Sequence, residues 1–134
     1  MTVTAYRWTL DRYHRAIASS IFDDQPLELL KGDIIVMSPE REPHAYYNTE
    51  TADYLRSLLG DRVKVRDGKP ITLPNDSEPV PDVAIVRPLG KLYLEHHPYP
   101  EDIFLVIEFS QATLGKDLSN KKSLYWRDTL KMRE

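Results

Sequence analysis

The chain contains no cysteine among its 134 residues. Disulfide bonds and thiolate-ligated metal sites are therefore excluded, although the absence of cysteine does not by itself assign a compartment. Charged residues interrupt every apolar run before it reaches the length of a membrane span, so we expect no membrane partner. The segment from Met1 to Arg7 lacks the long apolar stretch of a secretory signal, and we therefore expect a cytoplasmic protein.

The chain also lacks an excess of basic residues, with 18 Lys and Arg against 21 Asp and Glu and a net charge of −3. This balance argues against a protein that binds a phosphate backbone through its overall charge. It does not exclude an enzyme that acts on nucleic acid, because bound cations change the local charge of a carboxylate site. The length indicates a single domain, residues 1–134.

Hydrophobic periodicity predicts helices in separate parts of the chain. The first follows a cap at Thr9, the second begins near Pro43 and ends at Gly60, and another covers residues 117–128. In the second helix, the residues at helical spacing are expected to face the core: Tyr47, Thr51, Tyr54, Leu55, Leu58 and Leu59.

Short aliphatic runs separated by glycine turns predict hairpins. Residues 27–30 and 34–37 indicate one hairpin, and residues 63–66 and 70–73 indicate another. The order of helices and strands predicts a mixed α/β (α+β) fold, in which helices flank a central β-sheet.

Two further apolar runs each carry a carboxylate at one edge. Residues 82–86 begin with Asp82, and residues 103–107 are followed by Glu108, and both runs indicate buried strands. Buried carboxylates are rare without a partner, and a divalent cation is one such partner. Asp82, Glu108 and the backbone carbonyl of Phe109 are therefore candidate ligands of Mg²⁺ or Mn²⁺. Taken alone, Asp82 also fits a residue that caps a turn at the start of a strand.

A lysine close to such an ion can orient or deprotonate an attacking water. Lys121 and Lys122 lie in the last predicted helix and are the candidates for this role. Both border the apolar face of that helix, so helical spacing does not decide between them.

The histidines offer further candidates. His44 follows Pro43 at a helix start, where it is either a phosphate contact or proton carrier, or only a polar cap. His96 and His97 are adjacent, and successive side chains of an extended chain point in opposite directions. We therefore expect this pair to belong to a loop and not to share one ion.

Several tyrosines offer rings on which nucleic-acid bases can stack. They are Tyr46, Tyr47, Tyr54 and Tyr93. The helical spacing of Tyr47 and Tyr54 favours a place in the core for these two residues.

These features occur in an ordered set along the chain. The stretches are Arg7-Trp8-Thr9, Glu28-Leu29-Leu30-Lys31-Gly32-Asp33-Ile34, Met37-Ser38-Pro39, His44, Ser77-Glu78-Pro79-Val80-Pro81-Asp82, Leu105-Val106-Ile107-Glu108-Phe109-Ser110, and Lys121 with Leu124-Tyr125. From about Arg7 to about Tyr125 the chain resembles the Uma2 family, endonucleases of the PD-(D/E)XK superfamily that are frequent in cyanobacteria.

The resemblance implies a restriction-endonuclease-like core, a mixed central β-sheet flanked by helices, with Asp82 and Glu108 holding Mg²⁺. The superfamily usually has a lysine two positions after the second acid, where this chain has Ser110. In the family the lysine is relocated to the helix, and the Leu-Tyr register implies Lys121. The family pattern also implies Glu28 as a third acid, whereas the residues alone equally allow a solvated position on the polar face of a strand.

The chain departs from the family after Tyr125. Members usually continue with a Gly-Ile-x-Glu-Tyr-Trp-Ile-Val-Asp-like turn and strand, but here the sequence runs from Trp126 to Glu134 without it. We therefore expect a truncated C-terminal part that lacks the usual strands and leaves a sheet edge exposed. A homodimer partner is expected to cover that edge.

Three hypotheses follow. The first is a Mg²⁺-dependent DNA endonuclease in which Asp82 and Glu108 bind metal, Lys121 activates water, and Glu28 and His44 give support. The second is a catalytically silent, truncated nuclease fold that acts as a dimer or binds a partner. The third, a nucleic-acid-binding module without chemistry, has no basic cluster to support it.

Overall fold

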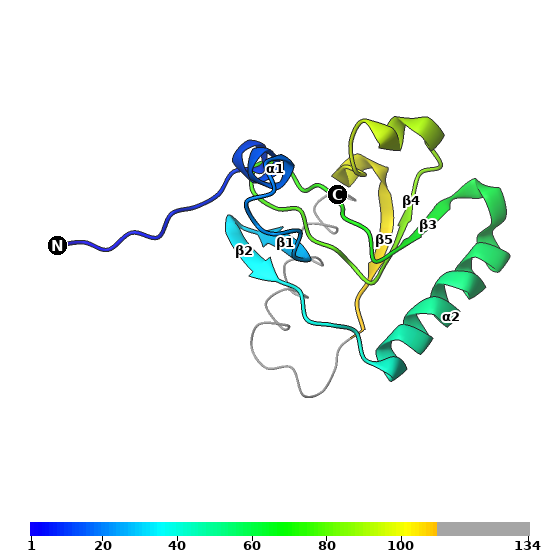
Figure 1. The fold of residues 1–134 in the computed structure, drawn as a ribbon. Helices are drawn as coiled ribbons and strands as arrows, with labels where there is room; N and C mark the ends of the chain where they lie inside the picture. Colours follow the sequence, from blue (N-terminus) through cyan, green and yellow to red (C-terminus); the bar gives the residue numbers. More distant parts are fainter. Residues whose placement is uncertain (110–134) are drawn as a thin grey trace.

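The computed structural model describes residues 1–109 of the chain (Figure 1). The predicted helix at 117–128 and the lysines within it lie outside the described residues. The elements follow one another in this order: α1 (Leu10–Ala18), β1 (Leu27–Leu30), β2 (Asp33–Val36), α2 (Glu42–Leu59), η1 (Gly60–Arg62), β3 (Lys64–Asp67), β4 (Val83–Val86), η2 (Gly90–Leu94), η3 (Pro100–Asp102) and β5 (Ile103–Ile107). The mixed α/β class is confirmed, and the pairs within the described residues are all antiparallel.

Helix α1 begins as its sequence predicts. The side chain of Thr9 accepts a hydrogen bond from the backbone N–H of Arg12, which satisfies one of the free amides of the first turn. Tyr13 and Ala16 form the buried side of the helix. This short helix is therefore held by packing as well as by its cap.

Strands β1 and β2 form the predicted first hairpin. Leu30 is paired with Asp33, so the turn consists of Lys31 and Gly32 alone. Both turn residues have positive φ angles, 48° and 81°, which is the conformation that a two-residue turn needs to match the twist of its strands. The amide of Trp8 donates to the carbonyl of Gly32 at 3.0 Å, which ties the N-terminal segment to this turn.

A second sheet has the strand order β3-β4-β5. Every residue of the central strand β4 is buried, as expected for an uninterrupted aliphatic run. Because side chains alternate along a strand, β4 contributes to two clusters. Ala84 and Val86 belong to one, and Val83 belongs to another that includes Ala52 of α2 and Val65 of β3. Helix α2 thus packs on one face of this sheet (Figure 1).

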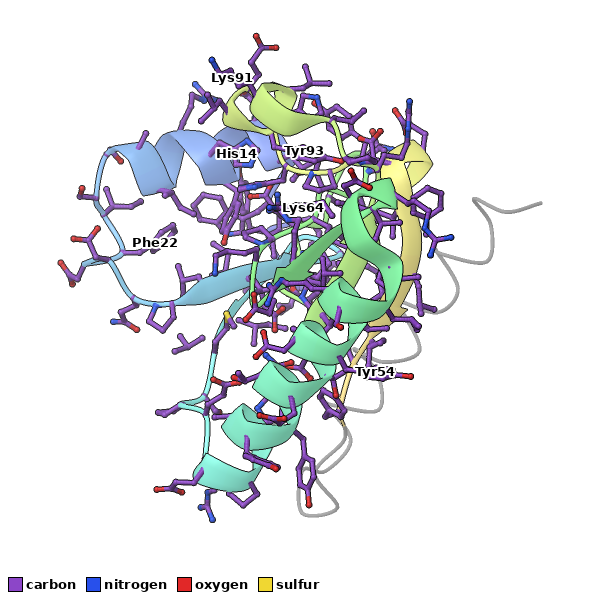
Figure 2. The ribbon with its side chains drawn as sticks, turned by 90° about the vertical axis from the view of Figure 1, so that its right-hand side faces the viewer. His14, Phe22, Tyr54, Lys64, Lys91 and Tyr93 are labelled. Carbon is purple, nitrogen blue, oxygen red and sulfur yellow. The ribbon has the colours of Figure 1, made fainter. Side chains whose placement is uncertain are left out.

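The predicted core face of α2 is confirmed only in part. Tyr47 is 60% exposed and Leu58 is also exposed. Tyr54, which is 64% exposed, points away from the sheet (Figure 2). Leu55 packs against the core as predicted, whereas the main buried residue beside it is Ala52, which the spacing did not predict. The physical reason is close approach, because the methyl group of Ala52 allows the helix backbone to lie near the sheet where a tyrosine would not fit.

The predicted second hairpin is also wrong. Strand β3 pairs with β4, and residues 70–73 form no strand apart from an isolated bridge between Leu73 and Ser77. Pro70 lacks the N–H that a ladder needs. The next two amides find other partners, since Ile71 donates to the carbonyl of Pro79 at 3.0 Å and Thr72 donates to the carbonyl of Pro98 at 2.9 Å.

Candidate metal centre

The antiparallel register of β4 and β5 brings Asp82 and Glu108 together. Val83, the first residue of β4, is paired with Ile107, the last residue of β5. Asp82 precedes the first of these and Glu108 follows the second, so both lie at the same end of the sheet. The expectation that these carboxylates come from neighbouring strands is confirmed.

Reciprocal hydrogen bonds join the two positions. The backbone N–H of Asp82 donates to Oε1 of Glu108 at 2.8 Å, and the backbone N–H of Phe109 donates to Oδ2 of Asp82 at 2.7 Å. The carboxylate of Asp82 therefore bonds across the sheet and not within a turn of its own. Each carboxylate oxygen has two lone pairs, so these bonds orient the groups and leave acceptor capacity for a cation.

Helix α2 adds His44 to this end of the sheet. Its Nε2 lies 3.1 Å from Oδ1 of Asp82, and its side chain is 13% exposed. The ring packs edge-on against Phe109, with 6.1 Å between centroids and 83° between planes. The cap position belongs to Arg41, which makes no side-chain capping bond. His44 therefore faces Asp82, and its interpretation as only a polar cap is wrong.

Glu40 is a neighbour that the sequence interpretation missed. Its Oε1 lies 3.0 Å from Nδ1 of His44. One ligand atom each from Glu40, His44 and Asp82 lies within 4.8 Å of the others, an arrangement that can hold a metal ion. The available signal was the four-residue spacing of Glu40 and His44. This signal is weak, because Glu40 precedes the helix, where a carboxylate resembles any polar loop residue.

Glu28 supports the segment that leads to Asp82. It is only 3% exposed, so the alternative of a solvated residue on a strand face is wrong. Its Oε1 accepts the backbone N–H of Val80 at 3.0 Å, two residues before Asp82. On the same strand, Leu29 exchanges backbone hydrogen bonds with Glu78. Strand β1 thus fixes the path of the chain into β4.

A second polar cluster surrounds the buried Glu78. Its Oε2 lies 2.7 Å from Nε2 of His14 and accepts the Thr72 hydroxyl at 3.0 Å. Burial, followed by the charges of Glu78 and Glu28, raises the pKa of Tyr13 to about 12. No pattern of residues predicts this cluster, because Glu78 stands in a proline-rich segment that resembles an exposed loop.

His96 and His97 contact different partners. The His96 ring stacks on Tyr99 with 4.0 Å between centroids, whereas Nε2 of His97 lies 3.8 Å from Oε1 of Glu78. Burial lowers the pKa of His97 below its ordinary value, and the positive charges of Arg66 and the other histidines add to this, against the opposing effect of Glu78. The two rings have different partners, and the pair belongs to a loop, as the sequence predicts.

The sequence model of Uma2, described as "Putative restriction endonuclease", matches residues 10–132. The chain belongs to the Uma2 family. No curated protein and no solved structure matches it. Membership of Uma2 indicates nuclease chemistry and agrees with the restriction-endonuclease-like arrangement of helices and sheet.

Two predictions about the site stay predictions. Lys121 and Lys122 lie outside the described residues, and the choice between them stays open. For Phe109 the described contact is its N–H to Asp82, so a role for its carbonyl stays a prediction.

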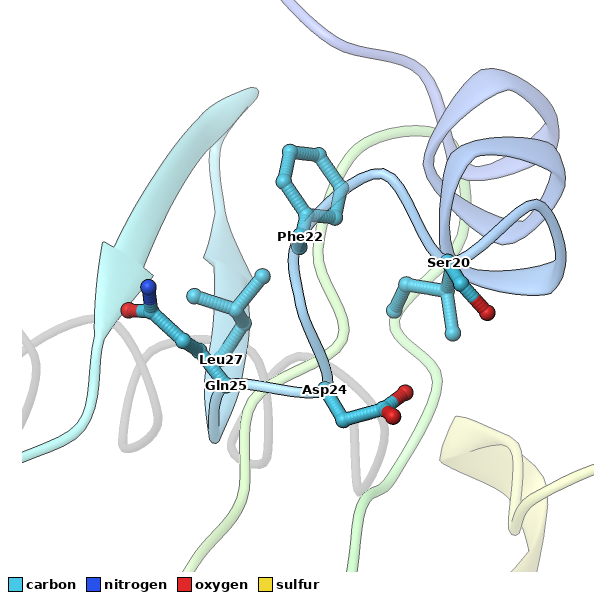
Figure 3. Close-up of a pocket in the computed structure, with 6 residues that line it drawn as sticks. Ser20, Phe22, Asp24, Gln25 and Leu27 are labelled. Atoms are coloured by element: carbon cyan, nitrogen blue, oxygen red, sulfur yellow. The ribbon is translucent and has the colours of Figure 1, made fainter.

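One cavity lies away from these carboxylates. It has a volume of about 160 Å³ and lies between the end of α1 and β1, where Phe22 and Leu27 face it (Figure 3). None of the candidate residues lines it. In residues 1–109 the structure has no helix with the length and apolar character needed to cross a membrane.

Proposed function

We propose that this Uma2 chain is a DNA endonuclease that depends on Mg²⁺ or Mn²⁺ and works as a single restriction-endonuclease-like domain. The main support for the proposal is the pair of hydrogen bonds that joins the Asp82 and Glu108 positions at one end of β4 and β5. Two partly buried carboxylates at one end of a sheet can supply oxygen ligands to a divalent cation, which favours their charged forms.

The donor set fits a hard divalent cation. Asp82 and Glu108 would supply carboxylate oxygens, and the carbonyl of Phe109 would supply a third, with water and substrate phosphate completing the shell. Such an ion, when bound, lowers the pKa of a coordinated water and withdraws charge from a phosphoryl oxygen.

The remaining residues have supporting roles in this proposal. Glu28 holds the backbone at Val80 and so positions Asp82. His44 lies against Asp82, where it can orient that carboxylate or hold a proton. Lys121, outside the described residues, is proposed to orient or deprotonate the attacking water. Water then attacks the phosphodiester directly, one P–O bond forms as another breaks, and no covalent enzyme intermediate is needed.

The test is nicking of supercoiled plasmid DNA with Mg²⁺ and with Mn²⁺. Asp82→Asn keeps an oxygen that can accept the Phe109 N–H but loses the charge, so the fold is retained while cation binding is lost. Asp61→Asn is the matched control, because Asp61 is exposed in η1. We expect metal-dependent nicking by the wild type and the control, and a loss of at least about a hundredfold in Asp82→Asn, equivalent to about 2.7 kcal/mol in the barrier.

The alternative is a catalytically silent nuclease fold that acts as a dimer or binds a partner. It predicts no metal-dependent nicking by the wild type at any metal concentration. Nicking that is equal in the wild type and Asp82→Asn would instead point to a contaminating nuclease and would remove the support for Asp82.

A further inference from the structure

One polar side chain of α2 lies between two residues that contact the start of β4. His44 lies against Asp82, the residue before that strand. Further along the helix, Ala52 packs against Val83, the first residue of β4. Residues four apart lie on the same face of a helix, so Asn48 shares this face with His44 and with Ala52. The side chain of Asn48 therefore faces the end of β4 that Asp82 precedes.

Phe109 supports this placement from the end of β5. Its ring packs edge-on against His44, and the residue also packs against the cluster that contains Ala52 and Val83. Asn48 is only 7% exposed. It is therefore enclosed where α2 meets the end of the sheet that carries the two acids.

The carboxamide oxygen of Asn48 is buried without a hydrogen bond from the protein. Oδ1 is shielded from solvent, and no group in residues 1–109 donates to it. Only three buried side-chain atoms of this part of the chain lack a hydrogen bond, and two of them, Oδ1 of Asn48 and Nδ1 of His44, lie on this one face of α2. Burying a carbonyl oxygen without a donor is costly, and native proteins contain few such groups. We therefore looked for a donor that belongs to the working site.

A cation held by Asp82 and Glu108 would bring donors of this kind. Mg²⁺ loses its waters reluctantly and keeps several of them when it binds to protein. The protons of a cation-bound water are more acidic than those of free water, so such a water is a strong donor. An amide oxygen accepts its hydrogen bond without placing a third negative charge beside the two carboxylates.

We propose that Asn48 is a positioning residue of the nuclease site, and that its Oδ1 accepts a hydrogen bond from a water bound to the divalent cation. This role rests on the proposed function, since it requires a cation at Asp82 and Glu108. Residues that contact a metal through one of its ligands change metal affinity or activity by about 10- to 100-fold when they are replaced. Asn48 should therefore affect the affinity for the cation and not only the rate of cleavage.

The test is Mn²⁺ binding to the full chain, followed by the electron paramagnetic resonance of the free ion, which needs no nuclease activity. Asn48→Leu removes the acceptor. Thr49→Leu is the matched control, because Thr49 is exposed on the same helix and Thr and Asn have similar helix propensities. We expect Mn²⁺ affinity to fall at least about tenfold in Asn48→Leu and to stay unchanged in Thr49→Leu. Asn48→Ala, which cannot overpack the site, should show the same fall.

Asn48→Asp distinguishes the two ends of the amide. It keeps an acceptor oxygen and removes the Nδ2 donor. We expect its Mn²⁺ affinity to equal that of the wild type or to exceed it, because the added charge attracts the cation. A loss as large as that in Asn48→Leu would assign the effect to Nδ2 and would overturn the role of Oδ1.

A purely structural role for Asn48 predicts a different response in the metal-free protein. If Oδ1 were bonded at all times, Asn48→Leu would break a hydrogen bond and the variant would unfold at a lower urea concentration. If the donor comes only with the cation, the metal-free protein carries the cost of an unpaired oxygen, which leucine removes while it keeps the branched shape. We therefore expect metal-free Asn48→Leu to unfold at a urea concentration no lower than the wild type. Mn²⁺ affinity that is equal in the two proteins, with earlier unfolding of the variant, would overturn the proposal.

The two proposals fail in different ways. Mg²⁺-dependent nicking that needs Asp82, combined with Mn²⁺ affinity that is equal in the wild type and Asn48→Leu, would leave the endonuclease and remove the role of Asn48. Mn²⁺ binding that needs both Asp82 and Asn48, in a protein that never nicks DNA, would support the role of Asn48 and remove the endonuclease. A wild type that binds no Mn²⁺ up to millimolar concentration would overturn both.

Discussion

The amide of Asp82 donates to the carboxylate of Glu108, and the amide that follows Glu108 donates back to the carboxylate of Asp82. The two acids are 26 residues apart in the chain and lie at the same end of two paired strands. Each carboxylate is therefore oriented by the strand that carries the other. This arrangement makes the position of each acid depend on the register of β4 and β5.

The buried contact of Glu28 with Val80 predicts a stability difference between two substitutions. Glu28→Ala leaves the Val80 N–H without this acceptor, which costs about 1–3 kcal/mol. Glu28→Gln keeps an oxygen acceptor, so its free energy of unfolding is expected to fall by less. Urea unfolding measures both, with the exposed Glu50→Ala as a control expected to stay within about 0.5 kcal/mol. Equal stability of Glu28→Ala and the wild type would show that Glu28 does not support this segment.

The turn between β1 and β2 predicts that Gly32 cannot be replaced. Gly32→Ala introduces a side chain at φ +81°, with its Cβ 3.1 Å from Cβ of Arg7 and 3.3 Å from the amide nitrogen of Trp8. Gly68→Ala is the matched control, because its φ is +61° but no atom lies within 4 Å of the added Cβ. We expect the free energy of unfolding to fall by about 1–2 kcal/mol in Gly68→Ala from backbone strain alone. The fall should be larger in Gly32→Ala. Equal losses in urea unfolding would contradict the close packing at Gly32.

The contact of α2 with the sheet predicts opposite responses on its two sides. Ala52 is fully buried against Val65 and Val83, so Ala52→Leu overpacks this contact and costs about 1–3 kcal/mol. Leu58 is exposed on the helix, so Leu58→Ala is expected to change the free energy of unfolding by less than about 0.5 kcal/mol. Thermal unfolding of both variants checks the assignment, and the reverse order would restore the predicted tyrosine-bearing core face.

The environment of His97 predicts a loss of stability in mild acid. Burial lowers the pKa of His97 below its ordinary value of 6.5, and the charges of Arg66, His14 and His96 add to this while Glu78 opposes it. The unfolded chain therefore binds the proton more readily, so stability falls as the pH drops below about 6.5. His97→Gln removes this titrating group. The free energy of unfolding, measured with urea, should therefore vary less with pH in that range. The same pH dependence in His97→Gln and the wild type would show that burial does not lower the pKa of His97.

Much of the fold follows from local patterns in the sequence. The all-aliphatic β4, the cap at Thr9, and the glycine turn of the first hairpin each have a direct physical cause in neighbouring residues. The proximity of Asp82 and Glu108 follows too, because a carboxylate before one buried strand and one after the next meet when the strands pair antiparallel.

Other features depend on contacts that local patterns do not contain. The stripe that includes Tyr47, Tyr54 and Leu58 is more apolar than the side that packs, where Ala52 contributes only a methyl group. Periodicity therefore predicts the helix and the packing of Leu55, but not the burial of Ala52. Glu40 was missed for a similar reason, because its importance comes only from the distance to His44 after α2 has packed on the sheet.

The most direct test of the account compares Asp82→Asn, Glu108→Gln and the double variant in Mg²⁺-dependent plasmid nicking. If both acids hold one ion, either single change removes the ion, and the double variant is no worse than the singles. The account predicts a loss of at least about a hundredfold in each of the three variants, with unchanged unfolding transitions. A single variant that nicks DNA at the wild-type rate would contradict a shared metal site. So would losses of nicking rate that multiply in the double variant.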